Sequence, residues 1–387
     1  MICPYFFSSS QRECKMQFID LKTQGQRIEQ KVMARIKAIL DHGLYIMGPE
    51  VDEFESLLAK FVGVEHALAV ASGTDALLIA LMALGIGHGD EVITTPFSFF
   101  ATAEVIALLG ATPVFVDIDE RTYNIDASKI EAAITSKTKA IMPVSLYGEC
   151  ADFDAINAIA AKYHLPVIED GAQSFGAEYK GRRSCGVTTI GCTSFFPSKP
   201  LGCYGDAGAC FTNDAELARR MTEIRLHGQS KRYYHTSLGI NGRCDTIQAA
   251  ILIEKIAIFE EEIAARLDVA KRYAAILPKS IRKPQVSAEN LCVYAQYTIE
   301  VDNRDALQAA LQKRGIPTAV HYPLGLHQQP IFKSLYAKPQ SFPKTEHAAS
   351  RVMSLPMHPY LSIDDQRFIC SALLEEISNL ENANIDA

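Results

Sequence analysis

Short apolar runs alternate with helical segments through the middle of the chain, and this alternation constrains the fold most. Each run has three to five residues, which suits a buried strand. Buried strands that alternate with helices indicate an α/β fold, with helices packed around a mostly parallel sheet. The runs are Ala67–Val70, Glu91–Thr94, Pro113–Val116, Ala140–Val144, Val167–Glu169, Cys192–Phe196 and Ala209–Thr212.

Segments on either side of this region predict further helices and a second domain. Apolar residues at helical spacing predict one helix over residues 26–40 and another over residues 50–61. Residues 246–277 form one long helical pattern after the last run. Beyond it, residues 294–301 alternate like a half-buried strand and residues 304–314 have helical spacing, which together indicate a smaller α+β domain.

These patterns divide the chain into two domains. We expect a large domain over residues 16–260 and a smaller C-terminal domain over residues 261–387, because the character of the sequence changes within the long helix or shortly after it. Residues 1–15 precede the first clear pattern, which opens at Met16. We expect them to be a disordered extension, with either Met1 or Met16 as the start.

Composition and charge exclude several classes of function. The formal net charge of −7 gives no support to nucleic-acid or membrane-surface binding, since both favour basic patches. No apolar helical stretch is long enough to span a bilayer, and the first residues lack the pattern of a signal peptide. Ten cysteines without a C-x-x-C pair suit a reducing compartment and predict no metal site. We expect a soluble, cytoplasmic protein.

A Ser-Gly-Thr turn at 72–74 joins the first apolar run to a helix. Free backbone N–H groups and the positive end of the helix dipole favour an anion at such a position, and glycine lets the anion approach closely. The hydroxyls of Ser72 and Thr74 add two donors. The same residues suit a plain helix cap, so this turn alone leaves both an anion site and a cap open.

Two carboxylates end the fifth apolar run, in Pro-Val-Ile-Glu-Asp-Gly-Ala-Gln at 166–173. Ligands of open α/β sheets bind outside the carboxyl ends of the strands, where Glu169 and Asp170 lie. An acid there could orient a sugar, hold a metal or face a protonated ring nitrogen. A helix cap for the segment after Gly171 explains the same residues, and the pattern alone leaves both interpretations open.

One lysine, Lys199, follows the sixth run in a turn that is rich in glycine and proline. Most lysines are solvated surface groups, but a lysine in a partly desolvated site has a lowered pKa and can act as an amine nucleophile or a base. Together, the three motifs offer what pyridoxal 5′-phosphate (PLP) needs. They supply an amine for an imine, an acid for the pyridinium nitrogen and a helix end for the phosphate.

These motifs resemble the DegT/DnrJ/EryC1/StrS family of sugar aminotransferases. The likeness covers Gly-Thr-Asp-Ala at 73–76, Ile-Glu-Asp-Gly-Ala-Gln at 168–173 and Ser-Phe-Phe-Pro-Ser-Lys at 194–199, and extends from about residue 18 to the C-terminal helices. The resemblance implies the type I fold of PLP-dependent transferases, as in aspartate aminotransferase. It also implies PLP as cofactor and a homodimer whose active sites lie at the subunit interface.

The same resemblance implies the site residues, position by position. Lys199 corresponds to the lysine that binds PLP as a Schiff base and later moves a proton. Asp170 corresponds to the acid that pairs with the ring nitrogen, and Gln173 to the glutamine near the ring and its phenolic oxygen. The remaining cofactor positions are Phe99 on the ring, Gly73, Thr74 and Ser194 on the phosphate, and Asn241 reaching the phosphate from the partner subunit.

A finer pattern concerns the substrate. Pro200 after the lysine, with Val-Tyr-Ala-Gln-Tyr-Thr at 293–298, resembles members of the family that aminate C3 of a UDP-linked 3-keto uronic acid for the O-antigen of lipopolysaccharide or for capsule sugars. Arg243 then corresponds to the arginine that meets the sugar carboxylate in a two-pronged way, although an interface ion pair would also explain it. His321 and Tyr322 correspond to residues that line the sugar site. Glutamate is the expected amino donor, leaving as 2-oxoglutarate.

Other functions fit the sequence less well. An aminotransferase for a dTDP-3-keto-6-deoxyhexose or a 4-keto sugar differs only in substrate. Sugar 3-dehydratases of the family carry histidine in place of Lys199. A nicotinamide dehydrogenase would need G-x-G-x-x-G between a strand and a helix, and Gly-Ile-Gly-His-Gly at 85–89 has neither the spacing nor the context. A regulator without catalysis is disfavoured by the intact Lys199, Asp170 and Gln173.

Overall fold

The strands of the central sheet form two hydrogen-bonded groups in the computed structural model, which describes residues 16–336 and 338–385. One group has the order β1-β9-β8-β5 and the other the order β3-β2-β4. Parallel bridges from Ile141 to Val167 and from Val144 to Asp170 join the two groups into one sheet. The strands are β1 His66–Val70, β2 Glu91–Thr94, β3 Thr112–Phe115, β4 Thr138–Met142, β5 Ile168–Asp170, β8 Ile190–Ser194 and β9 Gly208–Thr212.

Strand direction confirms the predicted mostly parallel sheet. β2 pairs in parallel with β3 and β4, and β5 pairs in parallel with β8. Among the described strands of this sheet, only β9 runs in the opposite direction, because it pairs antiparallel with both β8 and β1. Each predicted apolar run forms a strand whose ends lie within two residues of the prediction. The carboxyl ends of β4, β5 and β8 therefore meet at one edge of the sheet.

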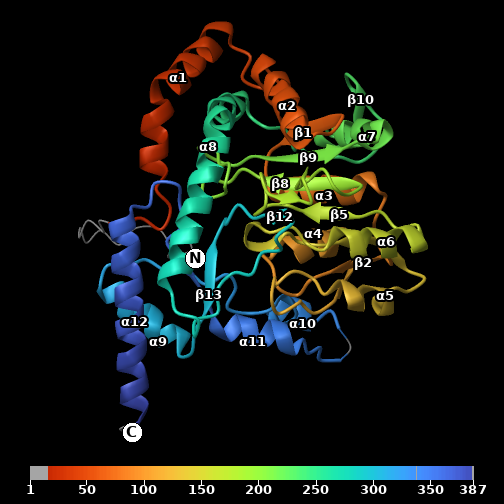
Figure 1. The fold of residues 1–387 in the computed structure, drawn as a ribbon. Coiled ribbons are helices and arrows are strands. Elements are labelled where there is room, and N and C mark those ends of the chain that lie inside the picture. The colour runs from red at the N-terminus through yellow and green to blue at the C-terminus, as the bar shows by residue number, and fades with distance from the viewer. Residues whose placement is uncertain (1–15, 337, 386–387) are drawn as a thin grey trace.

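Helices cover both faces of the sheet (Figure 1). Alternate residues of a strand point to opposite faces, and β1 shows this directly. Ala67 and Ala69 pack into one apolar core with residues of α2 and α8, whereas Leu68 and Val70 pack into another with residues of α3 and α7. The α-helices from the start of the described chain to residue 276 are α1 Leu21–His42, α2 Pro49–Val62, α3 Gly73–Ala83, α4 Ala101–Leu108, α5 Ile130–Ala133, α6 Phe153–Tyr163, α7 Ala215–Arg225 and α8 Thr246–Ile276.

The long helix α8 connects the sheet to the C-terminal part of the chain. Leu252 and Phe259, in its first half, belong to the core that contains α2. Val269 and Tyr273, in its second half, belong to a separate core with β13, β14 and α12. We propose that the division between the two expected domains passes through α8, which contains residue 260. The C-terminal elements are β12 Asn290–Leu291, β13 Tyr297–Glu300, α9 Arg304–Lys313, α10 Pro330–Lys333, α11 Pro343–Arg351, β14 Val352–Leu355 and α12 Ile363–Ile385.

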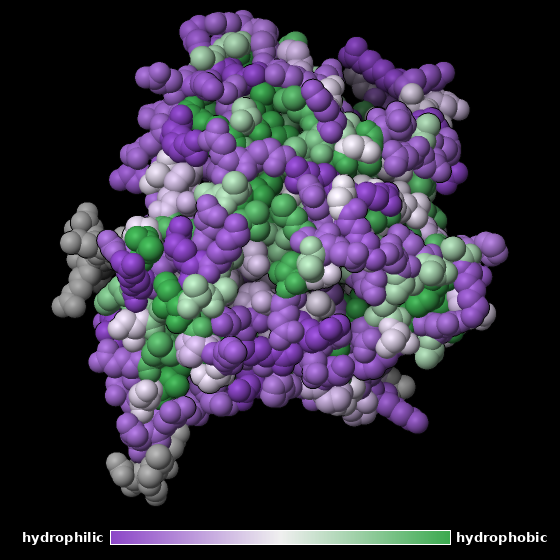
Figure 2. All heavy atoms as spheres, in the orientation of Figure 1, coloured by the Kyte–Doolittle hydropathy of each residue, from purple (hydrophilic) through white to green (hydrophobic). Residues whose placement is uncertain are grey.

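One face of the molecule is mostly polar (Figure 2), and short strands and turns connect the main elements. No helix among the described residues is long and apolar enough to cross a membrane. The face shown in Figure 2 is mostly hydrophilic, with hydrophobic patches between the polar side chains. The expected extension at residues 1–15 lies outside the described residues. The short elements are the strands β6 Glu178–Tyr179, β7 Arg182–Arg183, β10 Gln229–Lys231 and β11 Tyr234–His235, and the 3-10 turns η1 Ala127–Lys129, η2 Leu146–Gly148 and η3 Leu326–Gln328.

Candidate active site

A cavity of about 470 Å³ contains the carboxyl end of β5 and most of the predicted site residues. Its volume lies within the range of about 300–1,000 Å³ that is typical of small-molecule sites. Its walls come from the β1–α3 turn, the segment between β2 and α4, the end of β5 and the segment after β8. The residue before β13 and the segment between α9 and η3 complete them. The predicted residues that line it are Gly73, Thr74, Phe99, Asp170, Gln173, Ser194, Lys199, His321 and Tyr322.

Lys199 supplies the only lysine amine among the described lining residues. Lys199 lies in the turn after β8, where its backbone N–H donates to the backbone carbonyl of Phe196 at 2.8 Å. Burial lowers the pKa of Lys199, and the charge of Asp170 acts in the opposite direction. A lowered pKa increases the fraction of neutral amine at neutral pH, and the neutral amine is the nucleophilic form.

The two carboxylates at the end of β5 have different surroundings, because adjacent residues of a strand point to opposite faces. Glu169 is fully buried and accepts hydrogen bonds from the Ser145 and Ser184 hydroxyls at 2.7 and 2.6 Å and from the Cys185 N–H at 2.6 Å. Asp170 lines the cavity instead, and burial raises its pKa. The structure therefore separates one structural carboxylate from one that faces the ligand space.

The N-terminus of α3 lies against the end of β8 at the cavity wall. A side chain on Gly73 would bring its Cβ within 2.6 Å of the Ser194 Cβ, so this close approach requires glycine. Ser72 caps the helix by accepting from the Asp75 N–H at 3.0 Å. No partner for the N–H groups of Gly73 and Thr74 is found among the described residues. The turn is thus a helix cap that also leaves two backbone N–H donors at the cavity wall, as an anion site requires.

The amide of Gln173 is held from both ends. Its Oε1 accepts from the N–H of Tyr147 at 2.9 Å, and its Nε2 donates to the hydroxyl of Tyr322 at 3.0 Å. The Tyr147 N–H can only donate, so the amide end that faces it must be the oxygen. The NH2 end of Gln173 therefore faces the Tyr322 hydroxyl and holds it in place. The ring of Tyr322 lies 6.3 Å from that of Phe99, whose side chain is 56% exposed.

His321 contributes an uncharged ring to the cavity. Burial and the nearby charge of Lys199 lower the pKa of His321 to about 4, so the imidazole is neutral at neutral pH. Its Nδ1 lies 2.9 Å from the Ser354 hydroxyl, which in turn lies 3.0 Å from that of Thr298. The remaining nitrogen, Nε2, is therefore the atom that His321 can offer to a ligand.

Two predicted site residues, Asn241 and Arg243, do not line this cavity. Asn241 is exposed, and a backbone bridge pairs it with Leu226. Arg243 is half-buried and bridges to Val70 at the end of β1. The Nε of Arg243 is buried without a hydrogen-bond partner among the described residues. The expected roles of both residues thus need a second chain or a movement of this one.

Several lining residues were not predicted as site residues, including Ser98, Thr102 and Asp206, and Gln296 was quoted only as part of the motif at 293–298. Ser98 and Thr102 follow the carboxyl end of β2, and this is the signal that could have found them. Gln296 comes from a segment about one hundred residues beyond Lys199, and no local pattern connects the two.

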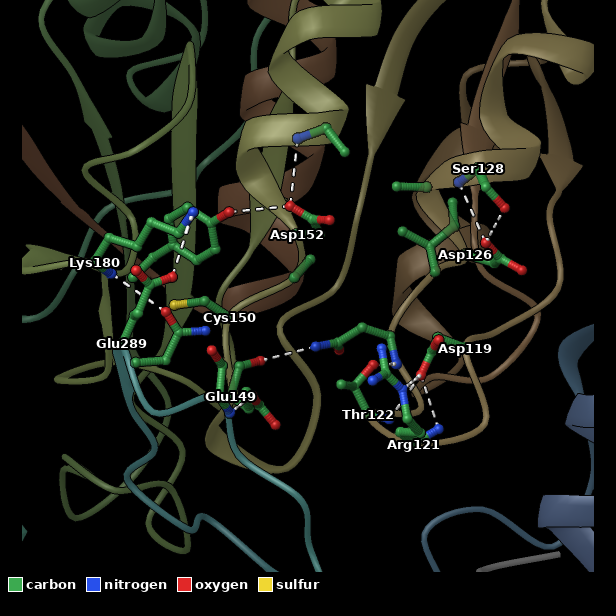
Figure 3. A pocket seen from close by; sticks show the side chains of 18 of the residues that line it. Asp119, Arg121, Thr122, Asp126, Ser128, Glu149, Cys150, Asp152, Lys180 and Glu289 are labelled. Carbon is green, nitrogen blue, oxygen red and sulfur yellow. Dashed lines mark hydrogen bonds and ion pairs between the residues drawn. The ribbon is translucent and has the colours of Figure 1, made fainter.

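A larger cavity of about 690 Å³ lies elsewhere and has a different character (Figure 3). Its charged groups mostly engage one another. Asp152 caps α6 and accepts from the Tyr179 hydroxyl at 3.0 Å, Asp126 caps η1, and Lys180 lies 3.6 Å from Glu289. The described residues contain no group of three or more potential metal ligands. We therefore place the candidate active site in the smaller cavity, where reactive groups remain available.

A buried carboxylate and a low-pKa amine at one sheet edge, beside an open helix N-terminus, define a class of α/β enzyme that can hold an anionic carbonyl cofactor. Comparison with known proteins identifies the class further. The profile of the DegT/DnrJ/EryC1/StrS aminotransferase family matches residues 26–374, and the chain belongs to this family. Its fold is that of the type I PLP-dependent transferases, as predicted.

Individual relatives cover nearly the whole chain. The UDP-2-acetamido-2-deoxy-3-oxo-D-glucuronate aminotransferase of Pseudomonas aeruginosa is 59% identical, over 92% of this chain and 99% of its own length. A family aminotransferase from Brucella abortus, known from its crystal structure, has a TM-score of 0.90 and 47% identity, covering 93% and 99%. NtdA of Bacillus subtilis, solved with bound cofactor PMP, has a TM-score of 0.88 and 32% identity, covering 96% and 87%.

Proposed function

We propose that the cavity binds PLP and that the protein transfers an amino group to a nucleotide-linked 3-keto sugar. One observation carries this proposal: the Lys199 amine, the Asp170 carboxylate and the open N-terminus of α3 share one cavity. PLP has an aldehyde, a basic ring nitrogen and a phosphate, and these groups need an amine, an acid and an anion site.

The surroundings of Asp170 test whether the residues of the cavity suit PLP. Its side chain is 5% exposed, and it forms no ion pair with the described residues. A buried carboxylate without a cation is costly, which is why burial raises the pKa of Asp170. A protonated ring nitrogen would supply the missing charge. Phe99, partly exposed at the cavity, offers the apolar surface that such a ring would cover. The residues present therefore fit the cofactor.

Different residues of the cavity would take different roles in transamination. When bound, PLP supplies an aldehyde that condenses with amines and a ring that takes up an electron pair. Lys199 would hold the cofactor, since burial favours its neutral amine. The same amine, when it is not bound to the cofactor, would be placed to move a proton to or from the substrate carbon. Asp170 would keep the ring nitrogen protonated, and Gly73, Thr74 and Ser194 would hold the phosphate.

The substrate we infer is UDP-2-acetamido-2-deoxy-3-oxo-glucuronate. The relative of that activity supports it by 59% identity over nearly the full length of both chains. Arg243 has the chemistry to bind the sugar carboxylate, and His321 and Tyr322 offer a neutral imidazole and a phenol to the sugar. The alternatives are a dTDP-3-keto-6-deoxyhexose, which has no carboxylate for Arg243, or a 4-keto sugar.

We further propose a cytoplasmic homodimer with shared active sites that uses glutamate as donor and serves O-antigen or capsule synthesis. Asn241 and Arg243 lie outside the cavity of their own chain, which suits a role in the cavity of the partner. Leu44, Tyr45 and Ile46, between α1 and α2, are each about half exposed and offer apolar surface for a second copy.

Replacing Lys199 tests the cofactor proposal. We expect Lys199→Ala to abolish transamination and the visible absorbance of bound PLP, because no other lysine is among the described residues that line the cavity. Lys255→Met is the matched control, since Lys255 is also buried, with a pKa lowered to about 8, but does not line the cavity. Borohydride reduction followed by peptide mass analysis should label Lys199 alone. Retained transamination in the Lys199→Ala variant would show that the assignment is wrong.

Replacing Arg243 tests the substrate. We expect Arg243→Ala to lower kcat/KM for the uronic acid substrate roughly 10- to 100-fold, the range for a lost charge-assisted hydrogen bond. A neutral 3-keto sugar nucleotide should lose little, because it has no carboxylate. Steady-state kinetics with both substrates provide the comparison. Equal losses on the two would remove the carboxylate role while leaving the cofactor proposal intact.

A further inference from the structure

Asp170 receives a hydrogen bond from the side chain of Thr102, a lining residue that no sequence motif indicated. The hydroxyl of Thr102 donates to its Oδ2 at 2.7 Å, and the N–H of Ala172 donates to its Oδ1 at 3.2 Å. Thr102 is fully buried in the first turn of α4 and lines the same cavity. The carboxylate is therefore held at both oxygens by groups from two separate elements.

The direction of the next hydrogen bond follows from the chemistry of hydroxyls. The Ser98 and Thr102 hydroxyls lie 2.8 Å apart, and distance alone does not identify the donor. A hydroxyl has one proton, and Thr102 gives its proton to the carboxylate, which accepts only. Ser98 must then donate to Thr102. The result is a directed chain, Ser98 to Thr102 to Asp170, whose dipoles all point their positive ends toward the carboxylate.

This chain favours the ionised form of Asp170 in a place where burial opposes it. Burial is the largest influence and raises the pKa of Asp170, and the Thr102 hydrogen bond is the largest influence that lowers it. A hydrogen bond to a charged group is stronger than one between neutral groups. Other ionisable groups also interact with the charge of Asp170, namely Lys199, Tyr322, Glu169, Cys185 and Cys192. None of these groups donates a hydrogen bond to the carboxylate, and among the described residues only Thr102 does so through its side chain.

We propose that Thr102, oriented by Ser98, is a positioning residue that keeps Asp170 ionised and aimed at the ring nitrogen of the cofactor. The inference rests on the proposed function, because it assigns Asp170 to that nitrogen. Neither Thr102 nor Ser98 touches the reacting atoms in this account. Their influence passes through Asp170, so it should appear in the electronic state of the bound cofactor as well as in the rate.

The test compares Thr102→Val with Thr102→Ser. Valine has nearly the shape of threonine but no hydroxyl, whereas serine keeps the hydroxyl. We expect Thr102→Val to weaken PLP binding by about tenfold or more, since a hydrogen bond to a charged group contributes about 1.5–3 kcal/mol. We also expect it to shift the pH midpoint of the absorbance of bound PLP. Thr102→Ser should restore both properties, and Ser98→Ala should move both in the direction of Thr102→Val, by less.

Thr94→Val provides the matched control. Thr94 is equally buried and donates a hydrogen bond of the same length, 2.7 Å, but to the carbonyl of Met142 and outside the cavity. A purely structural effect would lower stability in both valine variants and leave the pH midpoint unchanged. A Thr102→Val protein with the PLP affinity and pH midpoint of the wild type would overturn the inference. A wild-type protein that binds no PLP would instead overturn the proposed function.

Discussion

At the scale of single residues, Glu149 shows how burial makes stability depend on pH. Its side chain is 7% exposed beside the larger cavity, and among the described residues only the Ser287 N–H, at 3.3 Å, donates to its carboxylate. Burial raises the pKa of Glu149 from 4.5 to about 7. The folded state therefore binds this proton more tightly than the unfolded state, and stability falls as pH rises from about 4.5 through 7.

We expect Glu149→Gln to remove this pH dependence, because glutamine keeps the shape but does not ionise. The advantage of the variant over the wild type should grow between pH 5 and pH 8 by up to about 3 kcal/mol, the equivalent of the pKa shift. Urea unfolding at a series of pH values measures it. Glu289→Gln, in the same cavity but with a side chain 69% exposed, is the control. A constant difference at every pH would contradict the expectation.

Site residues with a local sequence signal could be predicted, and those that depend on the fold could not. Asp170 ends an apolar strand and Lys199 follows one. Ligands of open α/β sheets bind outside the carboxyl ends of the strands, so both residues were expected near a ligand. Thr102 and Tyr147 look like ordinary residues in the sequence. Their contacts with Asp170 and Gln173 span 68 and 26 positions, and only the packing of separate elements creates such contacts.

At the scale of elements, the junction between α3 and β8 determines the shape of the anion site. A glycine in a helix ordinarily costs stability relative to alanine, by roughly 0.5–1 kcal/mol. Gly73→Ala should have the opposite effect here, because the added Cβ would lie 2.6 Å from that of Ser194 and push α3 away from β8. We expect a lower Tm and PLP binding weakened by roughly tenfold or more, measured by thermal unfolding and PLP titration.

Gly87→Ala is the matched control for this substitution. A Cβ at Gly87 would come no nearer than 4.0 Å to the carbonyl oxygen of Leu109, so the change should be tolerated. Similar PLP affinities in the two variants would mean that the Gly73–Ser194 contact does not shape the anion site.

The order and direction of strands lie beyond a local reading of the sequence. The apolar run Glu91–Thr94 predicted both ends of β2 correctly, because a buried strand is apolar whichever strand it pairs with. The run that forms β9 looks the same as the others, yet β9 is antiparallel to β8 and β1. Direction depends on the connection that precedes a strand, and the Lys199 segment returns directly from β8 to β9 without a crossover helix.

At the scale of the whole molecule, the proposed shared active sites predict complementation between an inactive variant and an impaired one. If Arg243 serves the partner's cavity, a mixed dimer of Lys199→Ala and Arg243→Ala subunits contains one intact site. The other site carries both defects. Random mixing makes about half of the dimers mixed, so roughly a quarter of the wild-type activity on the uronic acid substrate should return.

The measurement is activity after unfolding and refolding the two variants together. Variants refolded separately and then assayed in one tube are the control, because they contain no mixed dimers. No recovery after joint refolding would place Arg243 and Lys199 in the same chain's site, or would show that the protein is not a dimer of this kind.

The helix α8 also has a consequence for recombination between relatives. Because its first half packs in the core with α2 and its second half in the core with α12, a crossover inside α8 would join halves that had adapted to different neighbours. A crossover after Leu277, where the helix has ended, keeps the helix whole but still exchanges one of its two partners. The C-terminal parts of such enzymes should therefore be inherited together with the sheet on which α8 rests, and chimeras should need compensating changes along this one helix.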